Sequence, residues 1–404
     1  MKIGILTFHQ SVNNGAVMQA YSLSKRLKEE YPDIDVEIID YRRESISQAY
    51  SFSAVGYLKA STSAVILAKR FVGLLRDPRL LKRLRVRTKI FENCIHMLPL
   101  SNVSIISDCT KELYDYIEKN YDVIIVGSDA VWNYTTRGFP NAYFTDPDLK
   151  VRKLSYAASC YGMDYINVVE NEKNELCRVF SNFDFIGVRD EATENFVKWS
   201  GCRKSVHHTC DPTVFLNVND LPIDVESFEK KLRERSFDFN RPTIGIMGPD
   251  KMLSMVRKLY SDKYQIVSLY NYIKGSDVNL YDLEPYEWAY VFRYFNLTFT
   301  TFFHGTLLSL RNGVPLICID LNTEFGKKHT PKTLDVLRRL GYEDWYFSTD
   351  YKSQNFDVIK AKADELLAGD YHDAIISAMD KEAESFEVFN KALKSMLGKD
   401  DNND

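Results

Sequence analysis

The sequence lacks the short motifs that mark several large enzyme classes. It contains no GxGxxG, P-loop, HExxH or GxSxG pattern, so the usual signals for dinucleotide binding, P-loop nucleotide binding, zinc proteolysis and α/β-hydrolase chemistry are missing. Its seven cysteines are scattered, without a C-x-x-C pair. The adjacent His207 and His208 would point to opposite faces of a strand. We therefore expect reduced thiols and no metal site.

Long hydrophobic runs are also missing. No run approaches the ~20 apolar residues that a membrane-spanning helix needs. The opening MKIGILTFHQ is predicted to be a buried strand rather than a signal peptide, because His9 and Gln10 end it early. The net charge of −4 and the pI near 6.1 give no whole-chain sign of nucleic-acid binding. With 45% hydrophobic and 27% charged residues, we expect a soluble, globular, cytoplasmic protein.

Short apolar runs alternate with longer helical patterns, which is typical of an α/β fold with largely parallel sheets. The 404 residues exceed what one core usually accommodates, so two domains are expected. The predicted strands are KIGILTF, DVEIID, YDVIIVGSD, KLSYAAS, FDFIGVRD and SVHHTCDPTVF in the first half, and RPTIGIMGPD, YQIVSLY, NLTFTT and VPLICID in the second.

A polar, charged stretch at 217–241 separates the two halves. The predicted domains are an N-terminal α/β domain at 1–235, a C-terminal α/β domain at 236–370, and a C-terminal helix and tail at 371–404 that packs back on the first domain. Parallel sheets bind ligands at the carboxyl ends of their strands, so the site is expected between the two domains.

The turn after the first strand contains Asn13, Asn14 and Gly15. Such a turn can adopt positive φ and presents the free N–H groups of the next helix, which suits an anion or a sugar phosphate. An ordinary helix cap explains the same residues, and both interpretations stay open here.

A second turn follows the strand VIIV. The backbone amides of Gly127 and Ser128 are candidates to hold an oxyanion, Asp129 to act as a base or bind hydroxyls, and Trp132, beside Asn133, to stack on a sugar ring. The alternative is a plain strand-to-helix turn in which the aspartate caps the helix.

Two further strand ends present Arg189 and His304. The arginine offers a fork of donors to a carboxylate or phosphate, unless it pairs with its own acidic neighbours. The histidine stands between a strand and a helix, where Gly305 lets a ligand approach and where an imidazole can transfer protons near neutral pH. A structural histidine would instead only bond a backbone carbonyl.

Two basic segments lie outside these turns. The loop TEFGKKHTPK suits an anionic substrate, or is a solvated surface loop; it contains Lys327, Lys328, His329 and Lys332. The segment 69–89 holds Lys69, Arg70, Arg76, Arg79, Lys82, Arg83, Arg85, Arg87 and Lys89 against Asp77 alone. Interleaved leucines suit an anionic membrane surface, although an ordinary surface helix with a basic face explains them too.

The ordered motifs of the chain resemble the polysaccharide pyruvyl transferase family over residues 3 to about 340. The motifs are NNGAVMQAYSL, VIIVGSDAVWN, KLSYAASCYG, FIGVRDEAT, CDPTVFL and FTTFFHGTLLSLRNGVPLICID. The resemblance implies a GT-B-like fold of two facing Rossmann-like domains. It also implies transfer of a pyruvyl group from phosphoenolpyruvate to two hydroxyls of a sugar in a cell-surface polysaccharide or its lipid-linked precursor, forming a cyclic ketal, with no further cofactor.

By this resemblance His304 is the catalytic histidine and Arg189 binds the donor. Asp129, from the turn after the strand VIIV, is the third catalytic candidate. The expected anion-binding residues are Gly127, Ser128, Gly305, Thr306, Lys327 and Lys328. The expected acceptor-binding residues are Asn14, Gly15, Trp132 and Asn133.

One position departs from the family pattern. Many members have an arginine two residues before the histidine, where this chain has Phe302. Either Lys327, Lys328 or His329 then supplies the missing charge, or the donor differs. A nucleotide-sugar-dependent GT-B glycosyltransferase and a non-catalytic glycan-binding member therefore remain alternatives. The membrane-facing interpretation of 69–89 would place the protein at the inner face of the membrane.

Overall fold

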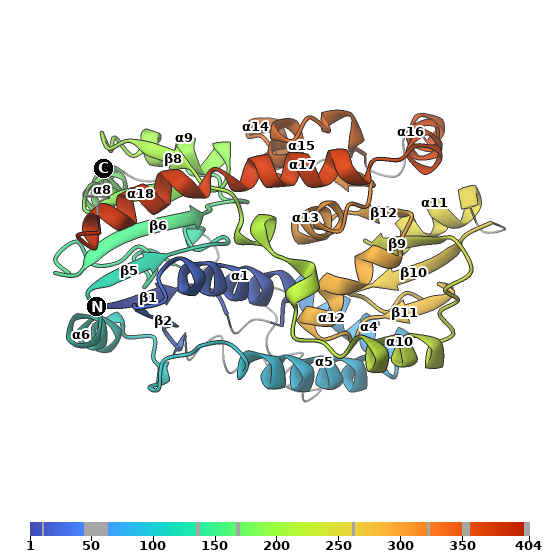
Figure 1. The fold of residues 1–404 in the computed structure, drawn as a ribbon, viewed down its shortest axis with the longest axis horizontal. Coiled ribbons are helices and arrows are strands. Elements are labelled where there is room, and N and C mark those ends of the chain that lie inside the picture. Colours follow the sequence, from blue (N-terminus) through green and yellow to red (C-terminus); the bar gives the residue numbers. More distant parts are fainter. Residues whose placement is uncertain are drawn as a thin grey trace.

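The chain forms two parallel six-stranded sheets, each covered by helices (Figure 1). This computed structural model describes residues 1–9, 12–43, 64–134, 138–166, 170–260, 263–320, 324–349 and 356–399. Strand pairing within both large sheets is parallel throughout the described residues. The predicted α/β class with parallel sheets in two domains is therefore confirmed.

The first sheet has the order β2-β1-β5-β6-β7-β8. Its strands are β1 (Lys2–Leu6), β2 (Asp35–Ile38), β5 (Val123–Val126), β6 (Arg152–Ala158), β7 (Phe185–Val188) and β8 (Val206–His208). Nearly every residue of β1 and β5 is buried, as expected when helices cover both faces of a parallel sheet. The apolar runs of the first half are thus strands, as the sequence predicts.

The second sheet has the order β11-β10-β9-β12-β13-β14. Its strands are β9 (Thr243–Met247), β10 (Gln265–Leu269), β11 (Val278–Leu280), β12 (Leu297–Thr300), β13 (Leu316–Asp320) and β14 (Tyr346–Ser348). The sequence does not signal the short edge strands β11 and β14, nor the two-stranded pair β3 (Tyr41–Arg42) and β4 (Ile105–Ile106).

Helices connect these strands. In the first domain they are α1 (Asn14–Glu30), α6 (Thr110–Asn120), α8 (Glu170–Ser181) and α9 (Glu191–Trp199). Beyond the first sheet they are α10 (Val225–Glu234), α11 (Asp250–Tyr260), α12 (Pro285–Tyr290), α13 (Phe303–Arg311), α14 (Glu324–Lys328), α15 (Lys332–Arg339) and α16 (Phe356–Ala368). Short 3-10 turns, among them Pro212–Phe215 after β8, complete the connections.

The C-terminal tail is two helices where one was expected. They are α17 (His372–Ala383) and α18 (Phe386–Met396), drawn in red along one side of both domains in Figure 1. Phe386 and Phe389 of α18 pack edge-on against Tyr156 of β6. The tail therefore does pack back on the first domain, while α17 lies beside α13 of the second.

The basic segment 69–89 is likewise split. Helix α4 (Ala64–Arg76) ends before Pro78, and α5 (Leu80–Ile95) begins after it, because proline disfavours helical geometry in the residue before it. No helix among the described residues is both long enough and apolar enough to cross a membrane.

Candidate functional site

His304 lies at the beginning of α13, where β12 ends. Phe302 occupies the extended N-cap position, and its backbone N–H donates to the Thr300 hydroxyl at 2.9 Å. His304 is the second residue of the helix, so its side chain lies among the free N–H groups at the positive end of the helix dipole. The imidazole is almost completely buried.

Helix α1 of the first domain meets this histidine directly. Asn13 caps α1 by accepting from the Gly15 N–H at 3.0 Å. A methyl group on Gly15 would lie 2.0 Å from Nδ1 of His304, which is far inside van der Waals contact. Glycine is therefore required at position 15 for the imidazole to approach α1. Two site residues that were predicted to have separate roles, Gly15 and His304, are therefore in contact.

Asp211 connects His304 to Arg189. Its carboxylate accepts from Nη1 of Arg189 at 2.7 Å and lies 3.6 Å from Nε2 of His304. Arg189 follows β7 and Asp211 follows β8, so adjacent parallel strands deliver both side chains to one edge of the sheet. Asp211 is not among the predicted site residues, although it lies in the CDPTVFL motif.

The carboxylates around Arg189 remain ionised. Burial acts to raise the pKa of Asp211, but the neighbouring His304 and Arg189 outweigh it and hold that pKa well below its usual range. Asp129, 3.5 Å from Nη2 of Arg189, has a lowered pKa for a similar reason: burial opposes the shift, while Arg189, Lys332 and His304 produce it. Asp129 is thus a charged group at neutral pH.

Several buried polar atoms of the cluster have no hydrogen-bond partner among the described residues. They are Nε and Nη2 of Arg189, Nε2 of His304 and, on α1, Oδ1 of Asn14. The guanidinium is only 1% exposed and lies over the Phe303 ring at 4.6 Å. Buried donors without partners are costly and uncommon, so this grouping indicates a place where a polar ligand completes the bonding.

Lys332, predicted above only as one cation of the loop TEFGKKHTPK, belongs to the cluster. Its Nζ lies 4.6 Å from the Tyr161 ring of the first domain and 4.9 Å from the Phe303 ring of the second. Burial, and next the nearby Arg189, lowers the pKa of Lys332 to about 8. The selected Lys327 and Lys328 are exposed instead, and Lys328 forms a 2.7 Å ion pair with Asp164.

The turn after β5 departs from its predicted role in part. Gly127 has φ +122°, and a side chain there would meet the Tyr156 carbonyl oxygen at 2.1 Å, so glycine is needed for close packing. Its N–H donates to the Leu6 carbonyl at 3.2 Å, and the buried Ser128 hydroxyl donates to Gln19. The expectation that the Gly127 amide holds an oxyanion is therefore wrong.

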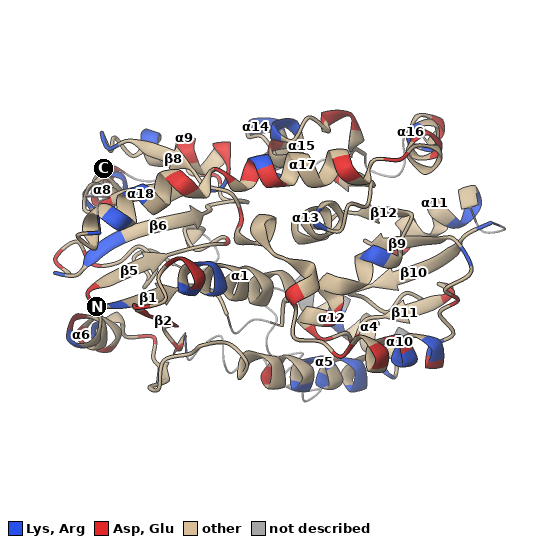
Figure 2. Cartoon of the chain, in the orientation of Figure 1, with Lys and Arg blue, Asp and Glu red and all other residues tan. Residues whose placement is uncertain are grey.

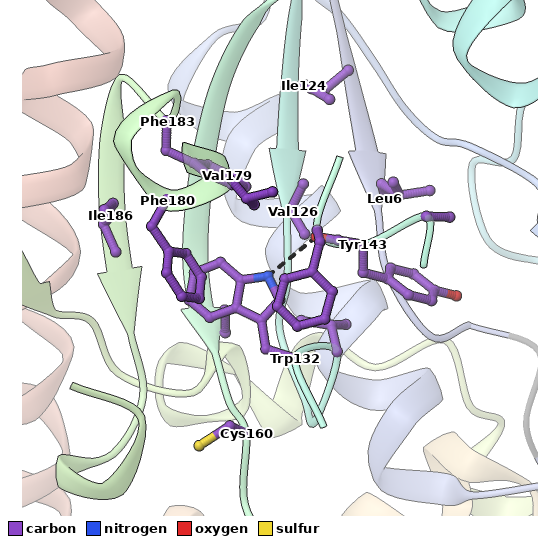
Figure 3. Packing of buried hydrophobic residues seen from close by; sticks show 14 of the residues in the cluster. Leu6, Ile124, Val126, Trp132, Tyr143, Cys160, Val179, Phe180, Phe183 and Ile186 are labelled. Carbon is purple, nitrogen blue, oxygen red and sulfur yellow. Dashed lines mark hydrogen bonds between the residues drawn. The ribbon is translucent and has the colours of Figure 1, made fainter. Parts of the chain in front are cut away.

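Trp132 is a core residue rather than a sugar platform. Its indole is fully buried, packs against Phe180 and Phe183, and donates to the Tyr143 carbonyl at 3.1 Å (Figure 3). The predicted stacking on a sugar is wrong, because both ring faces are already covered. Asn133 donates to the Tyr161 carbonyl at 2.7 Å. It therefore supports the loop that contains Tyr161, whose ring lies against Lys332.

The residues after His304 are also engaged internally. A Cβ on Gly305 would lie 2.6 Å from the Thr300 hydroxyl and 2.8 Å from the Met247 sulfur, so this glycine permits close helix–strand packing. The Thr306 N–H and hydroxyl both donate to the Phe302 carbonyl, at 2.9 and 3.2 Å. Anion binding by the Thr306 hydroxyl or amide is therefore contradicted. The described part of the chain also contains no histidine, cysteine and carboxylate group suited to a metal ion.

Comparison with known proteins identifies a family and a fold. A family model described as polysaccharide pyruvyl transferase matches residues 13–323. No curated protein matches the sequence significantly. The UDP-GlcNAc 2-epimerase from Neisseria meningitidis bound to UDP-GlcNAc has 9% identity and a TM-score of 0.55, covering 98% of this chain and 100% of that one.

Two further structures agree. A glycosyltransferase from Rickettsia africae has 10% identity and a TM-score of 0.53 over 100% of this chain and 99% of that one. A UDP-GlcNAc 2-epimerase from Methanocaldococcus jannaschii has 11% identity and a TM-score of 0.52 over 96% and 99%. At these identities the likeness shows the fold alone, and it confirms the predicted GT-B-like architecture.

Proposed function

The chain belongs to the polysaccharide pyruvyl transferase family, and on this premise we propose that it transfers a pyruvyl group from phosphoenolpyruvate to two hydroxyls of a sugar. The acceptor is a cell-surface polysaccharide or its precursor, and the product is a cyclic ketal. Because phosphoenolpyruvate is an intracellular metabolite, the proposal places the reaction in the cytoplasm.

One observation supports the proposal most strongly: donors of Arg189 and His304 that have no hydrogen bond within the described residues lie together near the beginning of α13. Phosphoenolpyruvate has a carboxylate and a phosphate, which together need several donors and positive charge. The guanidinium, the free N–H groups of the helix and the Lys332 ammonium supply both kinds of partner.

The reaction requires balanced proton transfers. The methylene carbon of phosphoenolpyruvate gains a proton and becomes a methyl group, C2 forms bonds to two sugar oxygens, and the bond from C2 to the phosphate oxygen breaks. One of the two hydroxyl protons balances the new methyl group, and the other leaves with inorganic phosphate. A group that both gives and accepts protons near neutral pH suits this sequence.

His304 is assigned that role. The Asp211 carboxylate lies 3.6 Å from Nε2 of His304, while Gly15 limits the ring position on the Nδ1 side. Asp211 is therefore a positioning residue, itself fixed by Arg189. Asn14 offers its Oδ1, which has no hydrogen-bond partner in the described part of the chain, as an acceptor for a sugar hydroxyl.

Lys332 replaces the positive charge that Phe302 cannot provide. Phe302 packs against Tyr270, with ring centroids 5.0 Å apart, so it belongs to an aromatic contact. Lys332 lies between the two domains and, with its pKa near 8, is mostly protonated at pH 7. We assign it to the donor phosphate or carboxylate.

The proposal is tested first by thermal unfolding with phosphoenolpyruvate, inorganic phosphate and a panel of nucleotide sugars. A ligand that binds only the folded protein raises both the free energy of unfolding and the melting temperature. At a ligand concentration of 100 times its Kd, the free energy of unfolding rises by about 2.7 kcal/mol. Phosphoenolpyruvate should give the largest shift. Lys332→Met should abolish the shift, whereas the matched surface variant Lys328→Met should keep it.

Turnover is measured next as phosphate released in the presence of candidate acceptors. His304→Ala should lose release while keeping the wild-type unfolding transition. A thermal shift with a nucleotide sugar, and none with phosphoenolpyruvate, would replace this proposal by the glycosyltransferase alternative. Full activity of the His304→Ala variant would remove that residue from the mechanism.

A further inference from the structure

Helix α4 presents an apolar face that the rest of the described chain leaves uncovered. Leu67, Phe71, Val72 and Leu75 are 44%, 53%, 41% and 68% exposed. Their spacing of four, one and three residues places them on one side of a helix. Large exposed apolar groups that are contiguous in this way mark interaction surfaces, whereas single ones do not.

Helix α5 follows α4 directly and contains several Lys and Arg residues (Figure 2). The basic residues between Arg79 and Lys89 include one set that contacts the second domain and one that is exposed to solvent. Arg83 and Arg87 point to the second domain, where they lie over the rings of Tyr272 and Tyr270 at 4.1 and 4.2 Å, and Arg87 also donates to the Tyr270 carbonyl at 3.1 Å. These two arginines fix α5 in place.

The second set faces solvent. Arg79, Lys82 and Lys89 are exposed, and Lys82 and Lys89, two helical turns apart, lie on the same side of α5. The surrounding segment 64–91 contains Asp77 as its single acid, and Asp77 pairs with Arg83. This is a strongly basic surface on a chain whose net charge is −4.

We propose that the α4–α5 hairpin (residues 64–95) docks on an anionic phospholipid bilayer, with the apolar face of α4 in the interface and the exposed cations of α5 over the lipid headgroups. Short helices with an apolar face, flanked by Lys and Arg, bind membranes in this way. A second copy of the chain is a poorer occupant, because two equally basic faces would repel each other.

The helix lies on the bilayer and does not cross it. Thirteen residues of α-helix are about 20 Å long, which is shorter than the ~30 Å hydrocarbon core. The inference is independent of the pyruvyl transfer proposed above, because it rests only on the composition and exposure of α4 and α5.

The test is co-sedimentation of the full chain with vesicles of phosphatidylcholine alone or with about one third phosphatidylglycerol. Binding should require the anionic lipid and weaken as salt rises. Each basic residue near such a surface contributes roughly a fivefold factor in binding, so Lys82→Glu with Lys89→Glu should weaken it at least about 25-fold. The exposed pair Lys251→Glu with Lys258→Glu on α11 is the matched control and should have little effect.

The apolar half is tested with Phe71→Ser and Leu75→Ser, which should also release the protein from anionic vesicles. The control is Val358→Ser with Val388→Ser, two exposed positions elsewhere. Equal binding to neutral and anionic vesicles, or unchanged binding by both α4 and α5 variants, would overturn the proposal. So would a wild-type dimer in analytical ultracentrifugation that Phe71→Ser dissociates, because a second copy would then cover this face.

Discussion

The contact between Gly15 and His304 makes Gly15→Ala the sharpest test of the site geometry. The new Cβ would lie 2.0, 2.3 and 2.7 Å from Nδ1, Cγ and Cε1 of the imidazole. Because ordinary contacts begin near 3.4 Å, the ring or the domain interface must move by more than about 1 Å. A misplacement of that size costs a reacting group about 100-fold in rate, so phosphate release should fall by that factor.

The stability of the same variant can be worked out independently of any activity. Overpacking of this kind costs about 1–3 kcal/mol, and the better helix propensity of alanine offsets at most about 1 kcal/mol. When His304→Ala removes the ring, the clash disappears, and Gly15→Ala should become neutral or slightly stabilising. The coupling between the two substitutions is therefore expected to be about 1–3 kcal/mol.

The assay is urea unfolding of the wild type, both single variants and the double variant. Gly73→Ala is the control for helix propensity, because a Cβ on Gly73 meets only Leu80 at 3.7 Å. If Gly15→Ala destabilises the protein equally with and without the His304 ring, then the imidazole is not packed on α1 and the site described above is wrong.

Two further predictions concern charge. Donor affinity should decline as pH rises through about 8, because Lys332, whose pKa is lowered to about 8, loses its positive charge there. Lys332→Arg should remove that decline when donor affinity is measured by titration calorimetry. If the variant and the wild type show the same dependence of donor affinity on pH, Lys332 is not part of the donor site. Asp211→Asn should destabilise the protein by about 3–5 kcal/mol at pH 7, since it leaves the buried Arg189 without its closest carboxylate. The folded-state pKa of Asp211 is depressed, so the stability that its carboxylate contributes is present above about pH 4 and is lost at lower pH. The difference in free energy of unfolding between wild type and variant, measured with urea, should therefore narrow towards pH 3. A difference that stays constant with pH would contradict the assigned ion pair.

The sequence predicts the fold well because buried parallel strands consist of short runs of apolar residues, which are easy to recognise. Residues 123–126 and 316–320 are examples, since both are almost wholly apolar and both form strands in the interior of a sheet. Edge strands such as β14 (Tyr346–Ser348) contain half-buried residues, so their pattern does not differ from that of a loop. The break between α4 and α5 has a signal in the sequence, Pro78.

The site is predicted less completely, because its chemistry depends on contacts between distant segments. His304 and Arg189 stand at strand ends and were recognisable from position. Asp211 and Lys332 matter only through their neighbours in space, which come from different strands and domains. Trp132 is the opposite case, because it was predicted to bind the ligand and is a core residue. An aromatic residue just after a turn can face either the ligand or the core, and only the contacts with Phe180 and Phe183 show that this one faces the core.

The site cluster around His304, Arg189 and Lys332 is made by residues of both domains. Movement of the two domains apart is therefore linked to the binding of a proton. Lys332 lies against Tyr161 of one domain and Phe303 of the other, and its pKa is lowered there by desolvation and by the nearby Arg189. If the domains part, the ammonium regains water and its pKa returns toward about 10.4. Between these two pKa values opening takes up a proton and closing releases one, so alkaline solution favours the closed molecule.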